Sequence, residues 1–243
     1  MNIDFTNKTV LVTGGTRGIG ASIVRHFENL NAEVIATGAN KDQFHKSINR
    51  KVKYLYLDLK NKKSISDFIE YISQQKKIDV LINNAGMNKI DSIEKIKDED
   101  WDNIYTINLY GPFILTRAIS KIMKKNKYGR IVNISSIFGV ISREKRAAYS
   151  STKSGLIGLT KATALDLAKD NILVNSISPG VIETELTKNI LGKKSMKELS
   201  NSIPLKRLGD SDEIAKLVLF LTSDQNTYIT GENIIIDGGY TIA

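Results

Sequence analysis

The chain has 243 residues with 41% hydrophobic content, and its 35 Lys and Arg residues outnumber its 26 Asp and Glu residues, for a formal net charge of +9. This length and composition suffice for one substantial core, so we expect a single domain over residues 1–243. The chain has no cysteine and only two histidines, His26 and His45. A disulfide or thiolate metal site is therefore excluded, and a histidine metal site is not expected.

The basic residues are spread over the whole chain in short runs, with no long uninterrupted block. This pattern favours a solvated basic surface over a nucleic-acid partner. The N-terminus, M-N-I-D-F-T-N-K, lacks the basic and apolar regions of a signal peptide, and no apolar run approaches the length of a membrane span. We therefore expect a cytoplasmic protein without a membrane partner.

The first elements suggest a nucleotide site. Residues 8–13 (K-T-V-L-V-T) form a short β-branched run typical of a buried strand, and from Ile19 to Leu30 the apolar spacing becomes helical. Between them stand the glycines Gly14, Gly15, Gly18 and Gly20. In the order strand, glycine turn, helix, backbone N–H groups and a helix N-terminus can hold a pyrophosphate. The spacing is T-G-x-x-x-G-x-G rather than the commoner G-x-G-x-x-G.

Strands and helices then alternate along the chain. Further strands are predicted at 33–37, 52–57, 79–82, 130–134, 172–177 and at the end of 229–237, and helices at 64–75, 98–124 and from 149 to about 168. The pattern of the 98–124 helix is broken only near Gly111-Pro112. The alternation predicts right-handed crossovers and an α/β fold, a Rossmann-type, doubly wound, seven-stranded parallel sheet with helices on both faces. The glycine turn, Asp58 and the N-N-A-G segment at 83–86 would then converge at the carboxyl ends of the strands.

The end of the second strand bears on the choice of cofactor. Dinucleotide folds commonly place an acidic residue there to bind the 2′-hydroxyl of NAD, whereas a basic residue suits the 2′-phosphate of NADP. No acid stands at Gly38, Ala39 or Asn40, and Arg17 and Lys41 offer positive charge. The sequence thus favours NADP over NAD, although both cations could be ordinary surface charge.

Tyr149 and Lys153 stand four residues apart in Y-S-S-T-K, so on a helix they share a face. A free phenol titrates near 10, and a neighbouring cation lowers that pKa toward the working range of a proton donor. Taken alone, the spacing is equally typical of an exposed pair on a helix surface. The other motifs of the chain decide between the two interpretations.

Several short motifs, in order, resemble the short-chain dehydrogenase/reductase family over nearly the whole chain. They are T-G-G-T-R-G-I-G at 13–20, Asp58, N-N-A-G at 83–86, Asn108, Ser136, Tyr149-x-x-x-Lys153 and S-P-G-V-I-E-T at 178–184. The spacing from Ser136 to Tyr149 is that of close relatives, which selects Ser136 over Ser135. The family chemistry is hydride transfer between a nicotinamide and a ketone or secondary alcohol.

The resemblance implies roles for four catalytic residues. Tyr149 would exchange its phenolic proton with the substrate oxygen, and Lys153 would lower the pKa of that phenol and hold the nicotinamide ribose. Ser136 would hydrogen-bond the carbonyl, and Asn108 would anchor the water chain that resupplies the proton. Besides Tyr149 and Lys153, the implied cofactor-binding residues are Gly14, Thr16, Arg17, Gly18, Ile19, Gly20, Ala39, Asn40, Asp58, Leu59, Asn84, Ala85, Gly86, Pro179, Gly180, Ile182 and Thr184. Asn83 could brace the sheet instead.

Within the family, the chain is most similar to 3-oxoacyl-acyl-carrier-protein reductases, including the ending G-E-N-I-I-I-D-G-G. That resemblance implies an acyl carrier protein as the bearer of the substrate. Two departures weaken this expectation: S-R-E-K-R-A-A-Y precedes the tyrosine, and Asp170 stands near where those reductases place a carrier-docking arginine. The cluster Lys124, Lys125 and Lys127 retains some positive charge on the expected side.

Two other functions remain open at this stage. Arg143, Lys145 and Arg146 lie just upstream of Tyr149 and could attract a phosphorylated or nucleotide-linked sugar, as in short-chain reductases that build cell-surface sugars, or be ordinary loop charge. The fold could also serve a cofactor-binding regulator without turnover.

Family members usually form tetramers through the two long helices and the last strand. Here these helices would be 98–124 and 149–168, and Gly155, Gly158, Ala162 and Ala164 on the second would allow close packing between subunits or within the chain. Residues 183–203 would form a lid over the substrate.

Overall fold

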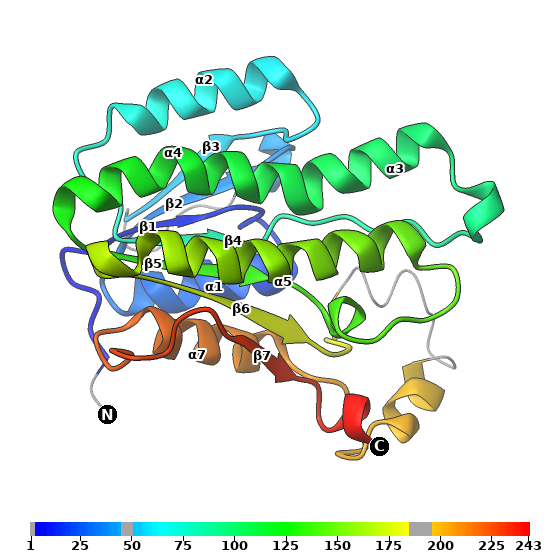
Figure 1. The fold of residues 1–243 in the computed structure, drawn as a ribbon. Helices are drawn as coiled ribbons and strands as arrows, with labels where there is room; N and C mark the ends of the chain where they lie inside the picture. The colour runs from blue at the N-terminus through cyan, green and yellow to red at the C-terminus, as the bar shows by residue number, and fades with distance from the viewer. Residues whose placement is uncertain (1–2, 45–50, 185–195) are drawn as a thin grey trace.

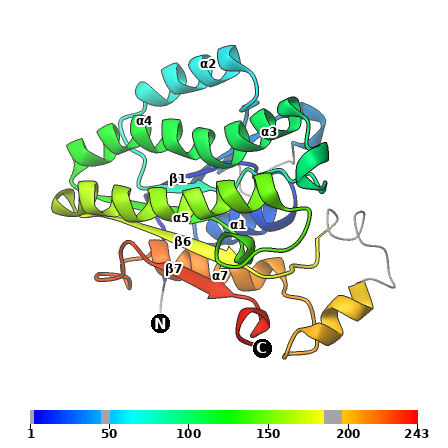
Figure 2. The same ribbon diagram turned by 45° about the vertical axis from the view of Figure 1, so that its right-hand side comes forward.

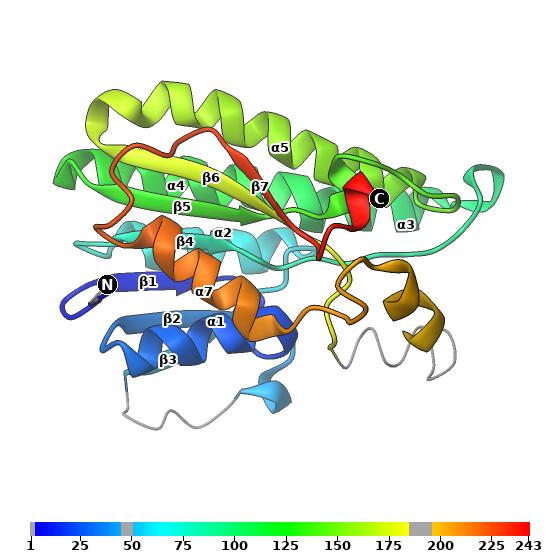
Figure 3. The same ribbon diagram turned by 90° about the horizontal axis from the view of Figure 1, so that it is seen from below.

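A computed structural model describes residues 3–44, 51–184 and 196–243. Its centre is a seven-stranded sheet in the order β3-β2-β1-β4-β5-β6-β7, in which every neighbouring pair is parallel (Figure 3). This confirms the predicted single-domain α/β fold. From β1 the chain first builds the sheet outward to β2 and β3, and it then returns to β4 on the other side of β1. The connections after β1 and β4 therefore run in opposite directions and leave a crevice at the carboxyl ends of these two strands. Open α/β sheets bind their ligands in such a crevice.

The elements run in chain order with short connections. The strands are β1 (Thr9–Val12), β2 (Glu33–Gly38), β3 (Val52–Tyr56), β4 (Val80–Asn83), β5 (Gly129–Ile134), β6 (Ile172–Pro179) and β7 (Asn233–Ile236). The α-helices are α1 (Gly18–Asn29), α2 (Lys62–Ser73), α3 (Asp98–Tyr105), α4 (Gly111–Asn126), α5 (Ala147–Leu167) and α7 (Ser211–Thr222). Residues 196–202 are also helical.

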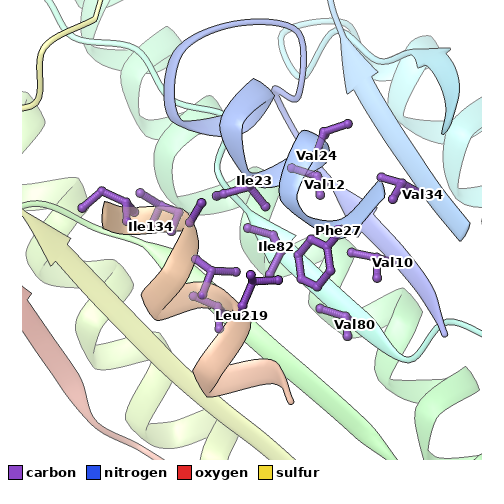
Figure 4. Packing of buried hydrophobic residues seen from close by; sticks show 14 of the residues in the cluster. Val10, Val12, Ile23, Val24, Phe27, Val34, Val80, Ile82, Ile134 and Leu219 are labelled. Carbon is purple, nitrogen blue, oxygen red and sulfur yellow. The ribbon is translucent and has the colours of Figure 1, made fainter. Parts of the chain in front are cut away.

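Helices cover both faces of the sheet, α1 and α7 on one and α2, α4 and α5 on the other (Figures 1 and 2). Successive strand residues point to opposite faces, so Val10 and Val12 of β1 pack in one core and Leu11 packs in the other. Figure 4 shows the first core, where Phe27 of α1 and Leu219 of α7 meet the strands. Strands buried on both faces explain the unbroken apolar runs of the sequence.

The helix α7 was not predicted, although its start carries a readable signal. Asp210 and Glu213 form a capping box, in which each side chain accepts a hydrogen bond from the other residue's backbone N–H. Asp212 in the first turn accepts hydrogen bonds from Ser22 and Arg25 of α1. The capping box therefore begins a helix whose packing against α1 closes the first core.

The predicted helix 98–124 is three pieces in the structure. Residues Thr106–Tyr110 form a π-helical turn between α3 and α4, upstream of the irregularity expected at Gly111-Pro112. A π turn accommodates one extra residue and shifts the side chains around it. It carries Asn108, which is fully buried.

No helix in the described parts of the chain is long and apolar enough to cross a membrane.

Candidate active site

The glycine turn after β1 has a backbone that only glycine tolerates. Gly14 and Gly18 have φ values of 63° and 54°, a region that side chains disfavour. A Cβ on Gly14 would lie 2.9 Å from Cα of Ala85, and one on Gly20 would lie 2.1 Å from the Gly14 carbonyl oxygen. The turn is thus packed tightly against both β4's end and α1.

The N-terminus of α1 opens beside this turn without a capping side chain on Arg17 and without an acidic residue in the first turn. Its first N–H groups and the positive end of the helix dipole can therefore serve an anion. The turn borders a cavity of about 540 Å³, which lies within the range of ligand sites. The predicted residues that line it are Gly14, Thr16, Arg17, Gly18, Ile19, Gly20, Ala39, Asn40, Asp58, Leu59, Asn84, Ala85, Gly86 and Thr184.

The two asparagines of N-N-A-G make different hydrogen bonds. Asn83 is buried in the sheet, where its Nδ2 donates to Asn133 Oδ1 at 2.8 Å. Asn84 donates from Nδ2 to the carbonyl oxygens of Thr13 at 2.9 Å and Gly14 at 3.0 Å. Asn83 therefore braces neighbouring strands, while Asn84 fixes the glycine turn and lines the cavity.

Of the two cations considered for the cofactor's phosphate, only Arg17 lines this cavity. The amine of Lys41 lies over the ring of Tyr56, 5.6 Å from its centroid. The side chain of Asn40 accepts a hydrogen bond from the Asp42 N–H and so caps the short 3₁₀ turn that follows. The geometry therefore favours Arg17 over Lys41 as the cation for the cofactor's phosphate, and this role stays a prediction.

Tyr149, Lys153 and Ser136 meet at a second cavity, of about 310 Å³, which α5, the end of β5 and the end of β6 border. The Ser136 hydroxyl lies close enough to the Tyr149 phenol to lower the pKa of that phenol. Ser136 also accepts from the Phe138 N–H at 3.2 Å, which fixes its side chain. By contrast, Ser135 donates to the Lys153 carbonyl oxygen at 3.0 Å. The geometry therefore sets Ser136, not Ser135, beside the tyrosine.

The amine of Lys153 is buried and donates to the carbonyl oxygen of Ile134 at 2.8 Å. It lies 5.6 Å from the centre of the Tyr149 ring. Burial lowers the pKa of Lys153 to about 8, because a charged amine loses its hydration there. The lysine is therefore poised to exchange protons near neutral pH.

The pKa of the Tyr149 phenol is shifted in the opposite direction from the one predicted. Burial raises its pKa, and the hydrogen bond with Ser136 and the charge of Arg146 lower it only in part. Lys153 is not among the groups that lower it here. The effect of Lys153 on the phenol stays a prediction, and Arg146 is a cation near the phenol that the sequence did not assign to this role.

Asn108 lines neither cavity but lies directly behind them. Its Oδ1 accepts from the Met87 N–H and its Nδ2 donates to the Met87 carbonyl oxygen, both at 2.9 Å. Nδ2 also donates to Thr152 Oγ1 on α5 at 3.2 Å. The side chain therefore ties the π turn to the segment after N-N-A-G and to the catalytic helix, and its predicted link to a water chain stays a prediction.

The two cavities adjoin, since both are lined by Ile19, Asn84, Gly86 and Thr184. Pro179, Gly180 and Ile182, predicted to line the nicotinamide, border the second cavity, as does Leu199 of the predicted lid. Residues 185–195 of that lid lie outside the described residues. The two cavities thus form one continuous groove that leads from the glycine turn to Tyr149.

Sequence reasoning missed other residues that line these cavities. They are Thr37, Gly38, Gln43, Leu57, Lys60, Met87 and Ile107 in the first and Asn88, Phe138, Val181 and Tyr240 in the second, besides Ile134 and Ser135. Gly38 ends β2 and Lys60 follows β3, so the rule that ligands bind at strand ends could have found them. Tyr240 comes from the far C-terminus and had no local signal.

Comparisons with known proteins agree with this geometry. A family model described as enoyl-(acyl carrier protein) reductase matches residues 14–241. The 3-oxoacyl-[acyl-carrier-protein] reductase FabG of Rickettsia felis is 40% identical over 241 residues, which cover 98% of this chain and 98% of the relative.

Two solved structures carry different cofactors. The 4-hydroxyisoleucine dehydrogenase complexed with NADH is 36% identical, with a TM-score of 0.91 over 98% of this chain and 100% of that one. ElxO with NADP bound is 31% identical, with a TM-score of 0.89 over 97% of this chain and 99% of that one.

The chain belongs to the short-chain dehydrogenase/reductase family, whose members are NAD(P)-dependent oxidoreductases acting on CH–OH and C=O groups. The protein accordingly binds a nicotinamide cofactor. Within the family it is similar to the 3-oxoacyl-[acyl-carrier-protein] reductases over nearly its full length.

Proposed function

We propose that this enzyme uses NADPH to reduce the 3-oxo group of an acyl thioester carried on acyl carrier protein, a step of fatty acid biosynthesis. The observation that carries this proposal is the meeting of Tyr149, Ser136 and Lys153 at a cavity that adjoins the glycine-lined one. The similarity to 3-oxoacyl-[acyl-carrier-protein] reductases supports the substrate class.

Each residue has a defined task in this reaction. Bound nicotinamide supplies the hydride that adds to the carbonyl carbon. Ser136 donates a hydrogen bond to the carbonyl oxygen, where negative charge grows. Tyr149 gives its phenolic proton to that oxygen. Lys153, whose pKa is about 8, lies behind the tyrosine and returns the proton, with Asn108 holding the segment through which it is resupplied.

The direct test is NADPH oxidation with acetoacetyl groups on acyl carrier protein and on N-acetylcysteamine. We expect both thioesters to be reduced, and the carrier-linked one at the lower KM. A protein that binds NADPH but oxidises it with neither thioester, nor with a simple diketone, would instead be a cofactor-binding regulator.

The preference for NADPH should depend on Arg17, the one predicted cation that lines the first cavity. A guanidinium contact with the 2′-phosphate contributes about 1.5–3 kcal/mol, so Arg17→Gln should raise KM for NADPH at least tenfold and leave KM for NADH within about twofold. Lys41→Gln is the matched control, because Lys41 packs on Tyr56 instead. Equal losses with both cofactors would contradict the assignment.

Carrier docking should be limited by Asp170. Its buried carboxylate binds Lys127, with 2.5 Å from Oδ1 to Nζ, and lies 3.8 Å from the amine of Lys124. These two lysines lower the pKa of Asp170, so the carboxylate stays charged and offsets the basic cluster that an acidic carrier would meet.

Asp170→Asn should therefore lower KM for the carrier-linked substrate about threefold to tenfold, since rim charges act mainly on association. KM for the N-acetylcysteamine thioester should not change, and the difference should shrink at high salt. Steady-state kinetics with both substrates measures this. If the KM values for both substrates fall alike, the lysines do not act on the carrier.

We further propose a homotetramer built on α4 and α5. Gly155 and Ala164 are used within the chain, against Leu109 and in the core, whereas Gly158 has no neighbour within 4 Å among the described atoms. Exposed apolar side chains stand on α3, α4, α5 and the π turn, at Trp101, Tyr105, Tyr110, Phe113 and Leu165. Light scattering of the purified protein tests the assembly.

A second candidate is the reduction of a small anionic carbonyl compound, such as a phosphorylated sugar. It is supported by Arg143 and Arg146, which line the cavity of Tyr149. Comparing phosphorylated and unphosphorylated sugars with the thioesters separates the two functions.

A further inference from the structure

The cavity of Tyr149 is lined by positively charged side chains. Arg143, Arg146 and Lys153 all line it, and no Asp or Glu stands among its described lining residues. Burial disfavours the charge of the Arg146 guanidinium and lowers its pKa; the Tyr149 phenol offsets this in part, and the charge of Arg143 adds to it. A cation held in such surroundings costs free energy unless an anion offsets it.

Unpartnered polar atoms lie in the same place. Nη1 of Arg146 and Oδ1 of Asn88 are shut off from solvent and have no hydrogen-bond partner in the described structure. Both residues line the cavity, and the Arg146 guanidinium is held 5.5 Å from the centre of the Phe138 ring. Because buried polar groups are nearly always paired, these atoms mark a place for a polar ligand. The Asn88 amide can offer its oxygen or, by turning over, its NH₂ group.

We propose that Arg146, with Asn88, binds the carboxylate of a small oxo acid whose carbonyl lies between Tyr149 and Ser136, so that the enzyme also interconverts short oxo acids and hydroxy acids. This activity rests on the proposed function, because it uses the same transfer. The carbonyl carbon takes the hydride that the nicotinamide loses, and the carbonyl oxygen takes the proton of Tyr149. The carboxylate keeps its charge, and no bond to it changes.

Size and shape favour a short acid. The cavity measures about 310 Å³ and also borders residues predicted to line the nicotinamide, Pro179, Ile182 and Thr184, so little room remains for substrate. Arg146 is the N-cap residue of α5 and stands three residues before Tyr149, about one helical turn away, so its charge and the phenol reach one small molecule. The planar guanidinium pairs with a carboxylate through two parallel hydrogen bonds. A phosphate group shares this chemistry and is the alternative source of the anion.

The test compares substrates that differ only in charge: acetoacetate against methyl acetoacetate, and dihydroxyacetone phosphate against dihydroxyacetone. The readout is the ratio of kcat/KM for the acid to that for its neutral partner, which cancels any common effect of a substitution on Tyr149. We expect Arg146→Gln to lower the acetoacetate ratio by about tenfold or more. Arg146→Lys should recover part of the ratio, and Arg143→Gln, at the other arginine of the cavity, should change it less than about threefold.

The outcomes separate this proposal from the proposed function. Reduction of the neutral ester by the wild type supports hydride transfer whatever the ratio does. An acetoacetate ratio that Arg146→Gln leaves unchanged overturns the carboxylate site, and so does a change confined to the phosphate pair. If no ketone is reduced, the proposed function fails, and the carboxylate site is tested by binding instead. Levulinate binding is measured by the quenching of the fluorescence of bound NADPH. The carboxylate site is supported if Arg146→Gln weakens levulinate binding about tenfold, and it is overturned if binding does not weaken.

Discussion

Tyr149→Phe should abolish nearly all turnover while leaving the cofactor site intact. The phenol lies beside Ser136 at the second cavity, and removal of a general acid costs on the order of 10²–10⁴ in kcat. The substitution removes a single oxygen from a partly buried side chain, so the fold should be retained. Steady-state NADPH oxidation gives kcat, and fluorescence titration gives the dissociation constant of NADPH, which should change less than about threefold.

Tyr240→Phe is the matched control, because Tyr240 lines the same cavity but has no assigned part in proton transfer. It should retain activity within a few-fold of wild type. A Tyr149→Phe variant that kept more than a tenth of the wild-type kcat would rule out the phenol as the proton donor.

Local sequence patterns were enough to predict the sheet. Most strands contain a short apolar run followed by a turn, and burial on both faces of β1 and β4 leaves residues 10–12 and 80–82 without a polar side chain. The glycine turn was readable for a similar reason. Its positive φ values and close contacts leave glycine as the only residue that fits, so the glycines in the sequence predict the turn directly.

Features set by contacts between distant segments were not predictable in this way. The π turn at Thr106–Tyr110 coincides with the reciprocal hydrogen bonds between Asn108 and Met87, and nothing in the local apolar spacing signals that pairing. Likewise, Tyr240 reaches the second cavity only because β7 is parallel to β6 at the edge of the sheet.

The electrostatics of the site also depend on burial that a sequence does not show. The spacing of Tyr149 and Lys153 predicted that the lysine lowers the phenol's pKa, yet in the structure burial dominates both groups. Arg146 was considered either as an attractor of a phosphorylated or nucleotide-linked sugar or as ordinary loop charge. Its contact with Phe138 and its buried, unpartnered atom are visible only in the structure.

Lys153→Met should lower activity on the order of 100-fold and, at neutral pH, make the protein more stable. Burial lowers the pKa of this amine to about 8, against an ordinary value of 10.5. Between these two values the unfolded chain binds more protons than the folded one, so this group makes the free energy of unfolding rise with pH across that window. Below pH 8 the folded state carries the whole cost of burying the charge.

Methionine removes that cost, but it leaves the Ile134 carbonyl oxygen without its hydrogen-bond donor. This loss lowers the free energy of unfolding by about 1 kcal/mol or more. We expect a net gain on the order of 1–2 kcal/mol at pH 7, which disappears as the pH rises from 8 to 10.5. Urea unfolding of wild type and variant across this range measures the difference. Lys161→Met, at an exposed position of the same helix, should show no such pH-dependent difference. A Lys153→Met variant that is less stable than wild type by the same amount at every pH would contradict this prediction. It would mean that burial does not disfavour the charged form of the amine. Lys153 would then stabilise the fold by packing, and it would not be a group that costs stability and serves proton transfer.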